Sequence, residues 1–201
     1  MFYYSVRLVL FLLCIFIYFY LYKRHHLTKI KSKIFWCVVA VVICVSFVFP
    51  IDNLLLSFSS PEKSYKYTHL GNTTVVAEGL NSSFLVEQKN EQSIYSLIPK
   101  KEDRWKTDLG HTTQLVYQKI DENIIVYFYK CKNTEDYYIS VLNTNGGVSD
   151  ITDNNNSYFT HIEYYDENTE NSYYTYYAYI GNLEKEYSVN IDNTVISFSK
   201  K

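Results

Sequence analysis

Glycine is scarce in this chain, which has only 6 Gly among 201 residues. Loops that cradle phosphate groups, such as the P-loop and the dinucleotide-binding turn, need closely spaced glycines so that the backbone can approach the phosphate. The sequence contains neither motif, and it also lacks the G-x-S-x-G nucleophile elbow of α/β-hydrolases. The glycine content therefore argues against nucleotide-binding folds and against that class of hydrolase.

Cysteine is nearly absent outside the N-terminal part of the chain. Cys14, Cys37 and Cys44 lie in two long apolar runs, which leaves Cys131 alone in the rest of the sequence. A single cysteine cannot form a disulfide within the chain, so burial of apolar surface must hold this part together. Cys131 ends the strand-like segment IIVYFYKC, and we expect it to be a buried structural thiol.

Residue patterns that bind metal ions are missing as well. His69, His111 and His161 form no H-x-x-x-H or H-E-x-x-H pair, which are spacings typical of zinc sites. Residues 149–158, SDITDNNNSY, are rich in oxygen ligands but have neither the sixth-position Gly nor the twelfth-position Glu of an EF-hand loop. A surface loop is the simpler interpretation of this segment, and a calcium site is the alternative. The sequence predicts no cofactor, no metal site and no catalytic residue, so we do not expect an enzyme.

What the chain does contain is long apolar sequence near its N-terminus. Residues 5–22, SVRLVLFLLCIFIYFYLY, carry one charge, on Arg7, and residues 34–51, IFWCVVAVVICVSFVFPI, carry none. A helix of about 18 residues is roughly 27 Å long, which is close to the thickness of a hydrocarbon core of about 30 Å. A cleaved signal peptide is the alternative for the first run, but the run has no A-x-A-like site. We expect two membrane-spanning helices, at about 5–22 and 34–51, with the lipid bilayer as their partner.

Basic residues fill the connection between the two runs, residues 23–33, and no acidic residue lies among them. They are Lys23, Arg24, Lys29, Lys31 and Lys33. Because short loops rich in Lys and Arg stay on the cytoplasmic side, these residues predict a cell-membrane protein with two spans and a cytoplasmic loop. The N-terminus and the C-terminal domain then lie outside. A patch for anionic lipid or nucleic acid is an alternative, but topology alone explains the charge.

The chain divides into residues 1–57, a helical hairpin with a net charge of +5, and residues 58–201, an extracytoplasmic domain with a net charge of −7. The acidic second part argues against a nucleic-acid partner. At its start, Ser60 is suited to cap a helix and Pro61 to occupy the first helical position. We therefore expect a short helix over about residues 61–69.

From residue 73 onward the sequence is typical of β-structure. Short segments rich in β-branched and aromatic residues alternate with turn-forming segments such as GLNS, KNEQ and NTNGG. The strand-like segments are TTVVAEG, SSFLVEQK, QSIYSLIPK, TTQLVYQKI, NIIVYFYK, DYYISVLN, SYFTHIEYY, SYYTYYAYIG, EYSVNI and TVISFSK. Since no amphipathic helix separates them, they predict an all-β domain of antiparallel sheets, folded as a sandwich or an open barrel.

Tyrosine is the residue in clear excess, with 22 in the chain. In the segment YYTYYAY, alternation along a strand places Tyr174 and Tyr176 on one face and Tyr173, Tyr177 and Tyr179 on the other. If one face packs on the core, the other presents a row of phenols suited to contact a protein, a peptide or a sugar. This candidate binding face has a simpler alternative, in which the tyrosines pair across strands and fill the rim of the core.

Three segments carry a resemblance to a known group of proteins: FPIDNLLLSFSSPEKSYKY, VVAEGLNSSFLVEQ and PKKEDRWK. They resemble uncharacterised two-helix membrane proteins of Gram-positive bacteria, in which the second helix ends in a Pro-x-acid-Asn segment and an SPE-type helix leads into a β domain. The resemblance covers roughly residues 30–106, and the rest of the chain loosely. It implies a membrane-anchored extracytoplasmic β domain in a bacterial cell envelope, and it implies no activity or catalytic residue.

Two functions fit these observations. The favoured one is a membrane-anchored interaction module whose exposed domain binds a membrane or envelope protein, a peptide or a polysaccharide. The alternative is an accessory or immunity-type membrane protein that acts through its helical hairpin. Exchange of the hairpin for an unrelated pair of helices distinguishes the two, because only an anchor tolerates that exchange.

Overall fold

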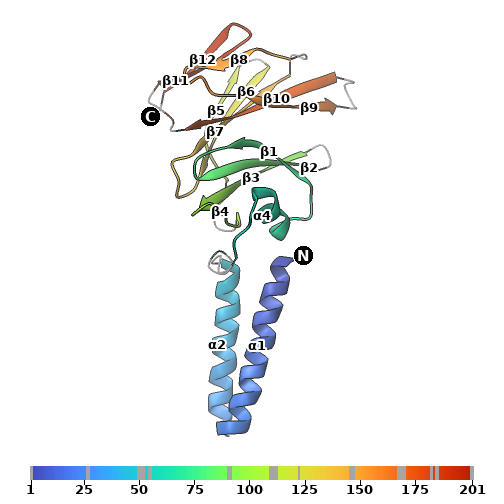
Figure 1. Ribbon diagram of the computed structural model, residues 1–201, viewed down its shortest axis with the longest axis vertical. Coiled ribbons are helices and arrows are strands. Elements are labelled where there is room, and N and C mark those ends of the chain that lie inside the picture. The colour runs from blue at the N-terminus through green and yellow to red at the C-terminus, as the bar shows by residue number, and fades with distance from the viewer. Residues whose placement is uncertain are drawn as a thin grey trace.

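The computed structural model describes residues 2–25, 28–48, 53, 56–89, 92–108, 113–121, 123–144, 148–166, 171–181, 183 and 186–199. In this part of the chain it contains two long helices, one short helix and twelve β-strands. The long helices α1 (Phe2–His25) and α2 (Lys29–Val48) form a stalk below a β domain (Figure 1). The short helix α4 (Pro61–Thr68) lies between the stalk and the strands.

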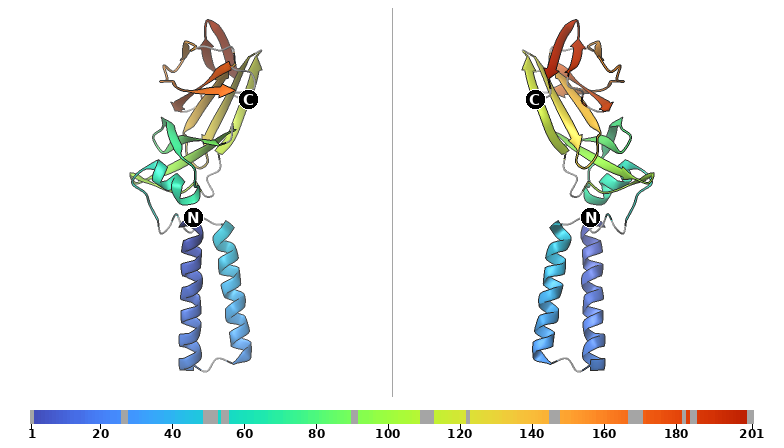
Figure 2. Two further views of the ribbon diagram at one scale, coloured as in Figure 1. Left: turned by 90° about the vertical axis from the view of Figure 1, so that its right-hand side faces the viewer. Right: turned by 90° about the vertical axis from the view of Figure 1, so that its left-hand side faces the viewer.

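The two stalk helices run antiparallel and side by side (Figure 2). Near one end, the Arg7 guanidinium donates a hydrogen bond of 2.6 Å to the Ser46 carbonyl oxygen. Toward the other end, the hydroxyl groups of Tyr18 and Ser32 share a hydrogen bond of 2.9 Å, and the rings of Tyr18 and Trp36 lie 5.3 Å apart. Many of the other stalk side chains are large, apolar and exposed. The stalk therefore differs from the amphipathic helices of soluble proteins, which present a polar face.

Within the described residues, α1 is the helix that is long and apolar enough to cross a membrane, over residues 6–24. The first turns of α2 hold three lysines, so its uncharged part is residues 34–48, which is shorter than the roughly 20 residues of a typical span. Residues 49–51, which complete the second expected span, lie outside the described residues. The structure thus shows one N-terminal apolar helix of spanning length, and the second span stays a prediction.

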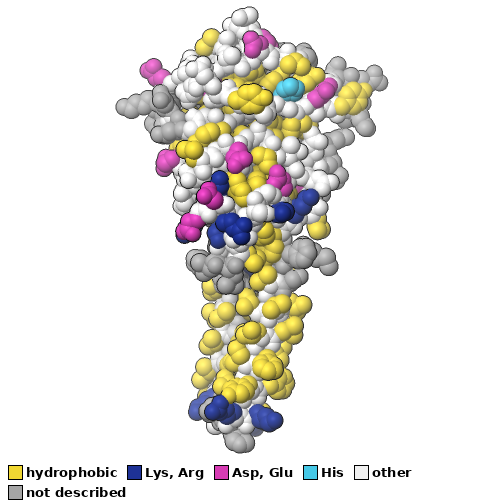
Figure 3. Space-filling view, viewed as in Figure 1, with side chains coloured by type: hydrophobic (Ala, Val, Ile, Leu, Met, Phe, Trp, Pro, Cys, Tyr) yellow, Lys and Arg dark blue, Asp and Glu magenta, His cyan; other side chains and the backbone are white. Residues whose placement is uncertain are grey.

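The basic connection between the helices is shorter than the sequence predicted. Lys23 and Arg24 belong to the last turn of α1, and Lys29, Lys31 and Lys33 belong to the first turns of α2. Lys and Arg are good helix formers, so both helices continue beyond their apolar parts. The five basic side chains are exposed at the same end of the stalk, where Figure 3 shows Lys and Arg gathered.

Three antiparallel sheets form the β domain. The first sheet has the order β1-β2-β3-β4, with β1 (Thr73–Glu78), β2 (Ser82–Lys89), β3 (Gln92–Lys101) and β4 (Arg104–Trp105). The second has the order β5-β6-β7-β10-β9, with β5 (Thr113–Asp121), β6 (Ile124–Cys131), β7 (Tyr137–Asn143), β10 (Asn171–Gly181) and β9 (Thr160–Asp166). The third has the order β12-β11-β8, with β12 (Thr194–Ser199), β11 (Glu186–Ile191) and β8 (Ile151–Asp153). The predicted β-rich domain with antiparallel sheets is confirmed.

The central strands of the second sheet, β6, β7 and β10, are buried on both faces. Phe128 of β6 packs on Tyr187 and Phe198 of the third sheet, with ring centroids 5.5 and 4.8 Å apart. Its neighbour Tyr129 points to the opposite face, because side chains alternate along a strand, and packs on Phe84 of the first sheet at 5.1 Å. A two-layer sandwich would leave one of these faces to solvent. The third sheet covers it here, so the domain has three β layers.

Helix α4 covers the outer face of the first sheet. Tyr65 of this helix is fully buried in a cluster with Leu85, Ile98 and Trp105. The Ser60 hydroxyl caps the helix by accepting a hydrogen bond of 3.3 Å from the backbone N–H of its third residue. The layers therefore follow one another from the stalk outward as α4, the first sheet, the second sheet and the third sheet.

Candidate functional site

The tyrosines that the sequence suggested as a binding face lie on β10, in the middle of the domain. Tyr176 is 3% exposed and belongs to the apolar cluster between the second and third sheets. Tyr177 is 0% exposed and belongs to the cluster between the first and second sheets. Neither face of β10 presents a phenol to solvent at these two positions.

The other tyrosines of this strand are half-buried and packed. Tyr173 stacks on Tyr164, with ring centroids 5.2 Å apart, Tyr174 packs against the cluster between the second and third sheets, and Tyr179 contacts the ring of Tyr138 at 5.5 Å. The expected exposed row of phenols is therefore wrong. The third sheet covers the face that a two-layer domain would leave free, and the simpler alternative, tyrosines that pack across strands, describes this strand.

Hydroxyl groups of these tyrosines are hydrogen-bonded between the first and second sheets. The Tyr177 hydroxyl lies 3.0 Å from the Tyr164 hydroxyl. The Tyr164 hydroxyl accepts a hydrogen bond of 3.0 Å from the Ser93 hydroxyl. Burial raises the pKa of Tyr177 and that of the neighbouring Tyr95. Because Tyr177 is enclosed between the two sheets, we assign this network to the packing of the domain.

A buried carboxylate joins the same two sheets. Asp136 is 1% exposed, and its Oδ2 accepts hydrogen bonds from the Asn81 backbone N–H at 2.7 Å and from the Ser82 hydroxyl at 2.8 Å. Its Oδ1 accepts a bond of 3.3 Å from the Tyr179 hydroxyl. Gly79 leaves room for this arrangement, since a Cβ there would lie 2.9 Å from Oδ2. Asp136 therefore fixes the turn between β1 and β2 to the turn between β6 and β7.

Replacement of Asp136 by Asn is expected to lower the free energy of unfolding. The amide oxygen can still accept from the Asn81 N–H and the Ser82 hydroxyl, but these bonds lose the negative charge of their acceptor. Hydrogen bonds to charged groups contribute about 1.5–3 kcal/mol, compared with about 1 kcal/mol for neutral ones. Urea denaturation of the full chain, followed by circular dichroism, measures the change. Asp103→Asn is the matched control, because the Asp103 side chain is 99% exposed. Equal unfolding midpoints for the two variants would contradict the role given to Asp136.

A second polar cluster lies under α4. Glu87 is 6% exposed and accepts a hydrogen bond from the Tyr65 hydroxyl, and burial, together with this carboxylate, raises the pKa of Tyr65. His69 stacks on the Tyr65 ring at 4.2 Å, and its Nδ1 lies 2.8 Å from the Thr68 hydroxyl and 3.8 Å from the Asp108 carboxylate. These contacts hold α4 on the first sheet.

Among the described residues, no three His, Cys, Asp or Glu side chains are placed to hold a metal ion. His161 lies against tyrosine rings of β10, and His111 lies outside the described residues. The segment 149–158 is not the surface loop that was expected throughout, because residues 151–153 form β8 of the third sheet. The Asp153 carboxylate accepts hydrogen bonds of 2.7 Å from the Tyr187 hydroxyl of β11 and from the Ser157 backbone N–H. This carboxylate therefore ties the turn that follows β8 to the neighbouring strand β11.

A cleft of about 640 Å³ opens at the end of the β domain nearest the stalk. We call it the lysine cleft, because four lysines and one acidic residue, Glu135, line it. The lysines are Lys100, Lys101, Lys106 and Lys132, and the other lining residues are Asn53, Asn81, Pro99, Asn133 and Thr134. Figure 3 shows Lys and Arg side chains gathered at this level, directly above the apolar stalk.

Four chain segments that are distant in sequence build the lysine cleft, and one of them is the segment at Asn53, before α4. Asn81 comes from the turn between β1 and β2, Lys100 and Lys106 from the hairpin of β3 and β4, and Lys132 from the turn between β6 and β7. The Lys100 backbone N–H donates to the Asn81 carbonyl at 2.7 Å, and that of Lys106 donates to the Pro99 carbonyl at 2.9 Å. These backbone bonds hold the walls of the cleft together.

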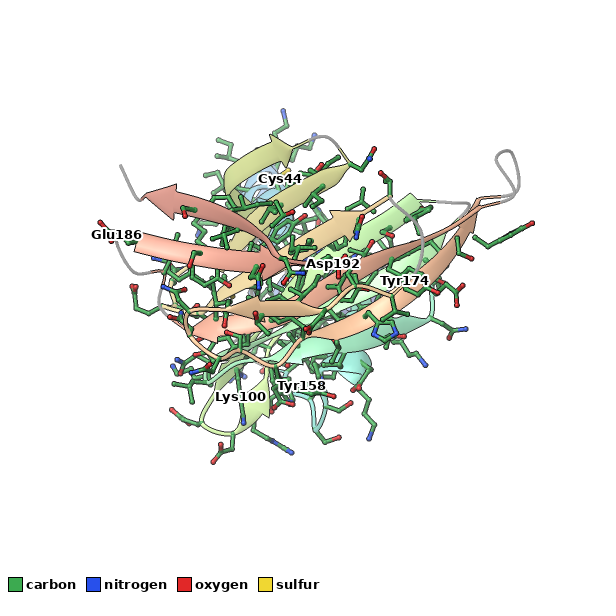
Figure 4. All side chains as sticks on the ribbon, turned by 90° about the horizontal axis from the view of Figure 1, so that it is seen from above. Cys44, Lys100, Tyr158, Tyr174, Glu186 and Asp192 are labelled. Atoms are coloured by element: carbon green, nitrogen blue, oxygen red, sulfur yellow. The ribbon has the colours of Figure 1, made fainter. Side chains whose placement is uncertain are left out.

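A smaller groove of about 390 Å³ lies beside β1 and is lined by Glu78, Tyr158, Thr160 and Tyr179, with three neighbouring residues of β1. Tyr158 is 84% exposed. Seen along the long axis of the molecule, Tyr158 and Lys100 lie on the same side of the domain (Figure 4). The groove is a second concave surface, and it has one exposed aromatic side chain.

The sequence analysis did not single out the lysine cleft. Three of its lysines stand in PKKEDRWK, where the acids Glu102 and Asp103 make the segment look like an ordinary charged turn. Lys132 follows in another turn, 26 residues after Lys106. The sequence does hold one sign of the cleft: several lysines stand close together between two predicted strands, although the domain has a net negative charge.

Comparisons with protein-family models, with curated proteins and with solved structures gave no match. The resemblance to two-helix membrane proteins therefore stays an expectation. Any function must follow from the geometry and the charges of the chain itself.

Proposed function

We propose that the chain is a membrane-anchored binding module, with its stalk in the bilayer and its β domain outside the cytoplasm. The exposed apolar surface of the stalk carries this proposal. Leu12, Phe16 and Val41 are 54%, 74% and 61% exposed, and apolar side chains follow the stalk over its length in Figure 3. Apolar surface of this extent is unfavourable in water and favourable in hydrocarbon.

The second span and the orientation are part of the proposal. The uncharged sequence of α2 continues through residues 49–51, which gives it the length that a span needs. Five basic residues lie at the end of the stalk that is remote from the β domain, and Arg7 lies near the other end. By the positive-inside rule, the remote end is cytoplasmic, and the N-terminus and the β domain are outside.

Reporter fusions test this orientation. A reporter that is active only outside the cytoplasm is expected to be active when fused after Lys201 and inactive when inserted at Thr28. The charge at the remote end sets the preference, so reversal of Lys29, Lys31 and Lys33 to Glu is expected to weaken it.

The matched control reverses Lys101, Lys130 and Lys132 to Glu. These substitutions change the net charge of the chain by the same amount as the reversal at Lys29, Lys31 and Lys33, but at positions far from the spans in sequence. This control variant should keep the orientation of the parent chain. An active reporter at Thr28, or an inactive one after Lys201, would refute the proposed topology.

The β domain supplies the binding function in this proposal. The lysine cleft and the groove beside β1 are concave surfaces of the size that small ligands and peptide side chains occupy. A membrane or envelope protein, a peptide or a polysaccharide remains the partner class expected for the module. The net charge of −7 on residues 58–201 disfavours nucleic acid.

One observation favours the alternative, an accessory or immunity-type protein that acts through the hairpin. Arg7 is 7% exposed, and it donates a hydrogen bond to Ser46 within the otherwise apolar stalk. A charged residue inside a bilayer marks a functional position in many membrane proteins. Exchange of residues 1–48 for an unrelated helix pair decides between the two, with rescue of a deletion phenotype as the readout. A pure anchor tolerates this exchange, and a hairpin with its own function does not.

A further inference from the structure

We propose that the lysine cleft binds the phosphate group of an anionic phospholipid from the membrane leaflet in which the stalk is anchored. This inference rests on the proposed anchoring, and it adds a ligand class and a site to it. The cleft would hold the β domain at the headgroup layer, so the domain would be positioned by lipid as well as by its covalent connection to the stalk.

Charge is segregated between the lysine cleft and the rest of the β domain. Residues 58–201 carry a net charge of −7, yet the described residues that line this cleft include four lysines and one acid. That acid, Glu135, lies 3.5 Å from Lys130, a fifth basic residue beside the cleft. A concave surface lined mainly by one sign of charge focuses the electrostatic potential and raises the local concentration of opposite charges. The ligand is therefore expected to be an anion.

The lysines of the cleft keep hydrogen-bond donors with which they can bind an anion. The Lys106 ammonium donates one hydrogen bond, of 3.2 Å, to the Leu56 carbonyl, and an ammonium group carries three donor hydrogens. Lys100 lies 5.4 Å from the Trp105 ring centroid and 3.7 Å from Asp103. The Asp103 side chain is 99% exposed, so this ion pair is weak and readily exchanged for a phosphate oxygen.

The cleft lies close in sequence and in space to the end of α2. Asn53 lines it and lies five residues after the end of α2 at Val48, so the connecting chain spans at most about 18 Å. Its side chain accepts hydrogen bonds from the backbone N–H of Thr107 at 2.6 Å and from the Thr107 hydroxyl at 2.8 Å. This clamp ties the base of the β domain to the exit of α2, at the level where the headgroups of a membrane around the stalk would lie.

The size of the cleft fits a headgroup. Its volume of about 640 Å³ lies within the range of roughly 300–1,000 Å³ that is usual for small-molecule sites. The amide side chains of Asn81 and Asn133 line the same cleft and offer donors for the hydroxyl or phosphate oxygens of a headgroup. A phosphodiester with a polar substituent, as in phosphatidylglycerol, combines the charge and the hydrogen-bonding groups that this lining selects.

Native mass spectrometry of the full chain in a neutral detergent tests the proposal. The probes are short-chain phosphatidylglycerol, phosphatidylcholine with the same acyl chains, and inorganic phosphate. We expect phosphatidylglycerol to bind at least tenfold more tightly than phosphatidylcholine. Each lysine beside anionic lipid contributes roughly fivefold in affinity, so Lys101→Gln/Lys132→Gln should weaken phosphatidylglycerol binding about 25-fold.

The matched control is Lys63→Gln/Lys66→Gln, which removes two exposed lysines of α4 at the same end of the domain. It should leave the affinity unchanged within about twofold, since these residues do not line the cleft. Equal loss in both double variants would show attraction by net charge alone and would overturn the site. Inorganic phosphate that binds as tightly as the lipid would overturn the lipid as its source.

The outcome is separable from that of the topology test, because binding in detergent does not depend on orientation. Reporters that place the β domain inside, with lipid binding retained, would refute the topology and leave the cleft as a lipid site. Reporters that place it outside, with no preference for phosphatidylglycerol, would refute the lipid site and leave the anchored module standing.

Discussion

The β domain is expected to unfold in a single step when the pH is raised to between about 11 and 12. Several tyrosines of its core are less than one-tenth exposed, and in five of them burial raises the pKa of the phenol above its ordinary value. These five are Tyr65, Tyr129, Tyr138, Tyr177 and Tyr187. The unfolded chain has no such protection, and its phenols ionise near pH 10.

The sign of the effect follows from this difference. Above about pH 10 the unfolded state loses phenolic protons that the folded state keeps, so the free energy of unfolding falls as the pH rises. Each tyrosine contributes about 1.4 kcal/mol by pH 11, and five contribute about 7 kcal/mol. Domains are stable by about 5–15 kcal/mol, so the loss is of the same size as the whole stability.

The measurement follows two signals on the full chain in nanodiscs: phenolate absorbance and far-ultraviolet circular dichroism. The buried phenols should ionise in the same step in which the β-sheet signal is lost, after the exposed phenols have titrated gradually. Tyr129→Phe removes one of the buried hydroxyl groups and should move the step to higher pH. Complete ionisation of the tyrosines near pH 10 with an unchanged β-sheet signal would show that these phenols are accessible in the folded domain.

Replacement of Tyr177 by Ala is expected to cost about 3–5 kcal/mol of stability, as is usual for the deletion of a buried aromatic ring. Its ring packs on Phe84 with centroids 5.7 Å apart, in the cluster between the first and second sheets. Tyr176→Ala should cost a similar amount, because Tyr176 fills the cluster on the opposite face. Substitutions on both faces of β10 should therefore destabilise the domain.

Tyr165→Ala is the control for this pair of substitutions. Tyr165 lies on the neighbouring strand β9 and is 62% exposed, so its loss should change the free energy of unfolding by no more than about 0.5 kcal/mol. Thermal and urea denaturation compare the three variants. A Tyr176→Ala or Tyr177→Ala domain that melts with the parent would mean that one face of β10 is free, as the sequence analysis first suggested.

The short helix, the buried thiol and the strands could be predicted because each depends on residues that are neighbours in the sequence. The helix capped by Ser60 and opened by Pro61 runs over Pro61–Thr68, close to the predicted 61–69, because caps are set by residues next to each other. Cys131 is 0% exposed and burial raises its pKa, which confirms the expected buried thiol. The strand-like segments were readable because β-branched and aromatic side chains favour extended backbone.

The stacking of three sheets was not predicted, although the sequence held a sign of it. The runs YYISVL (residues 137–142) and YYTYYAYI (residues 173–180) each contain only one residue that is neither apolar nor aromatic, and such runs are typical of strands buried on both faces. The sequence analysis assigned one face to solvent. Which segment covers the second face depends on the long-range pairing of β11 with β8 and β12, and no local pattern specifies that pairing.

The lysines of the cleft can be seen in the sequence, but their convergence in space cannot, for the same reason. Lys101 ends β3 of the first sheet and Lys132 follows β6 of the second sheet, and Asp136 brings them together because it fixes the turn that follows Lys132 to the turn at Asn81. The ends of the stalk helices were also misplaced. Lys23 and Lys29 carry charge, but they extend helices rather than end them.

The layered order of the domain has a consequence for its biogenesis. The layers lie in nearly the same order in space as in the chain, from α4 next to the stalk to β11 and β12 farthest away, with β8 as the exception. A domain delivered across a membrane N-terminus first would expose its segments to the far side in this order. Each folded layer would then offer an apolar face on which the next segment to emerge can pack. The domain could therefore fold layer by layer before its C-terminal strands have crossed the membrane.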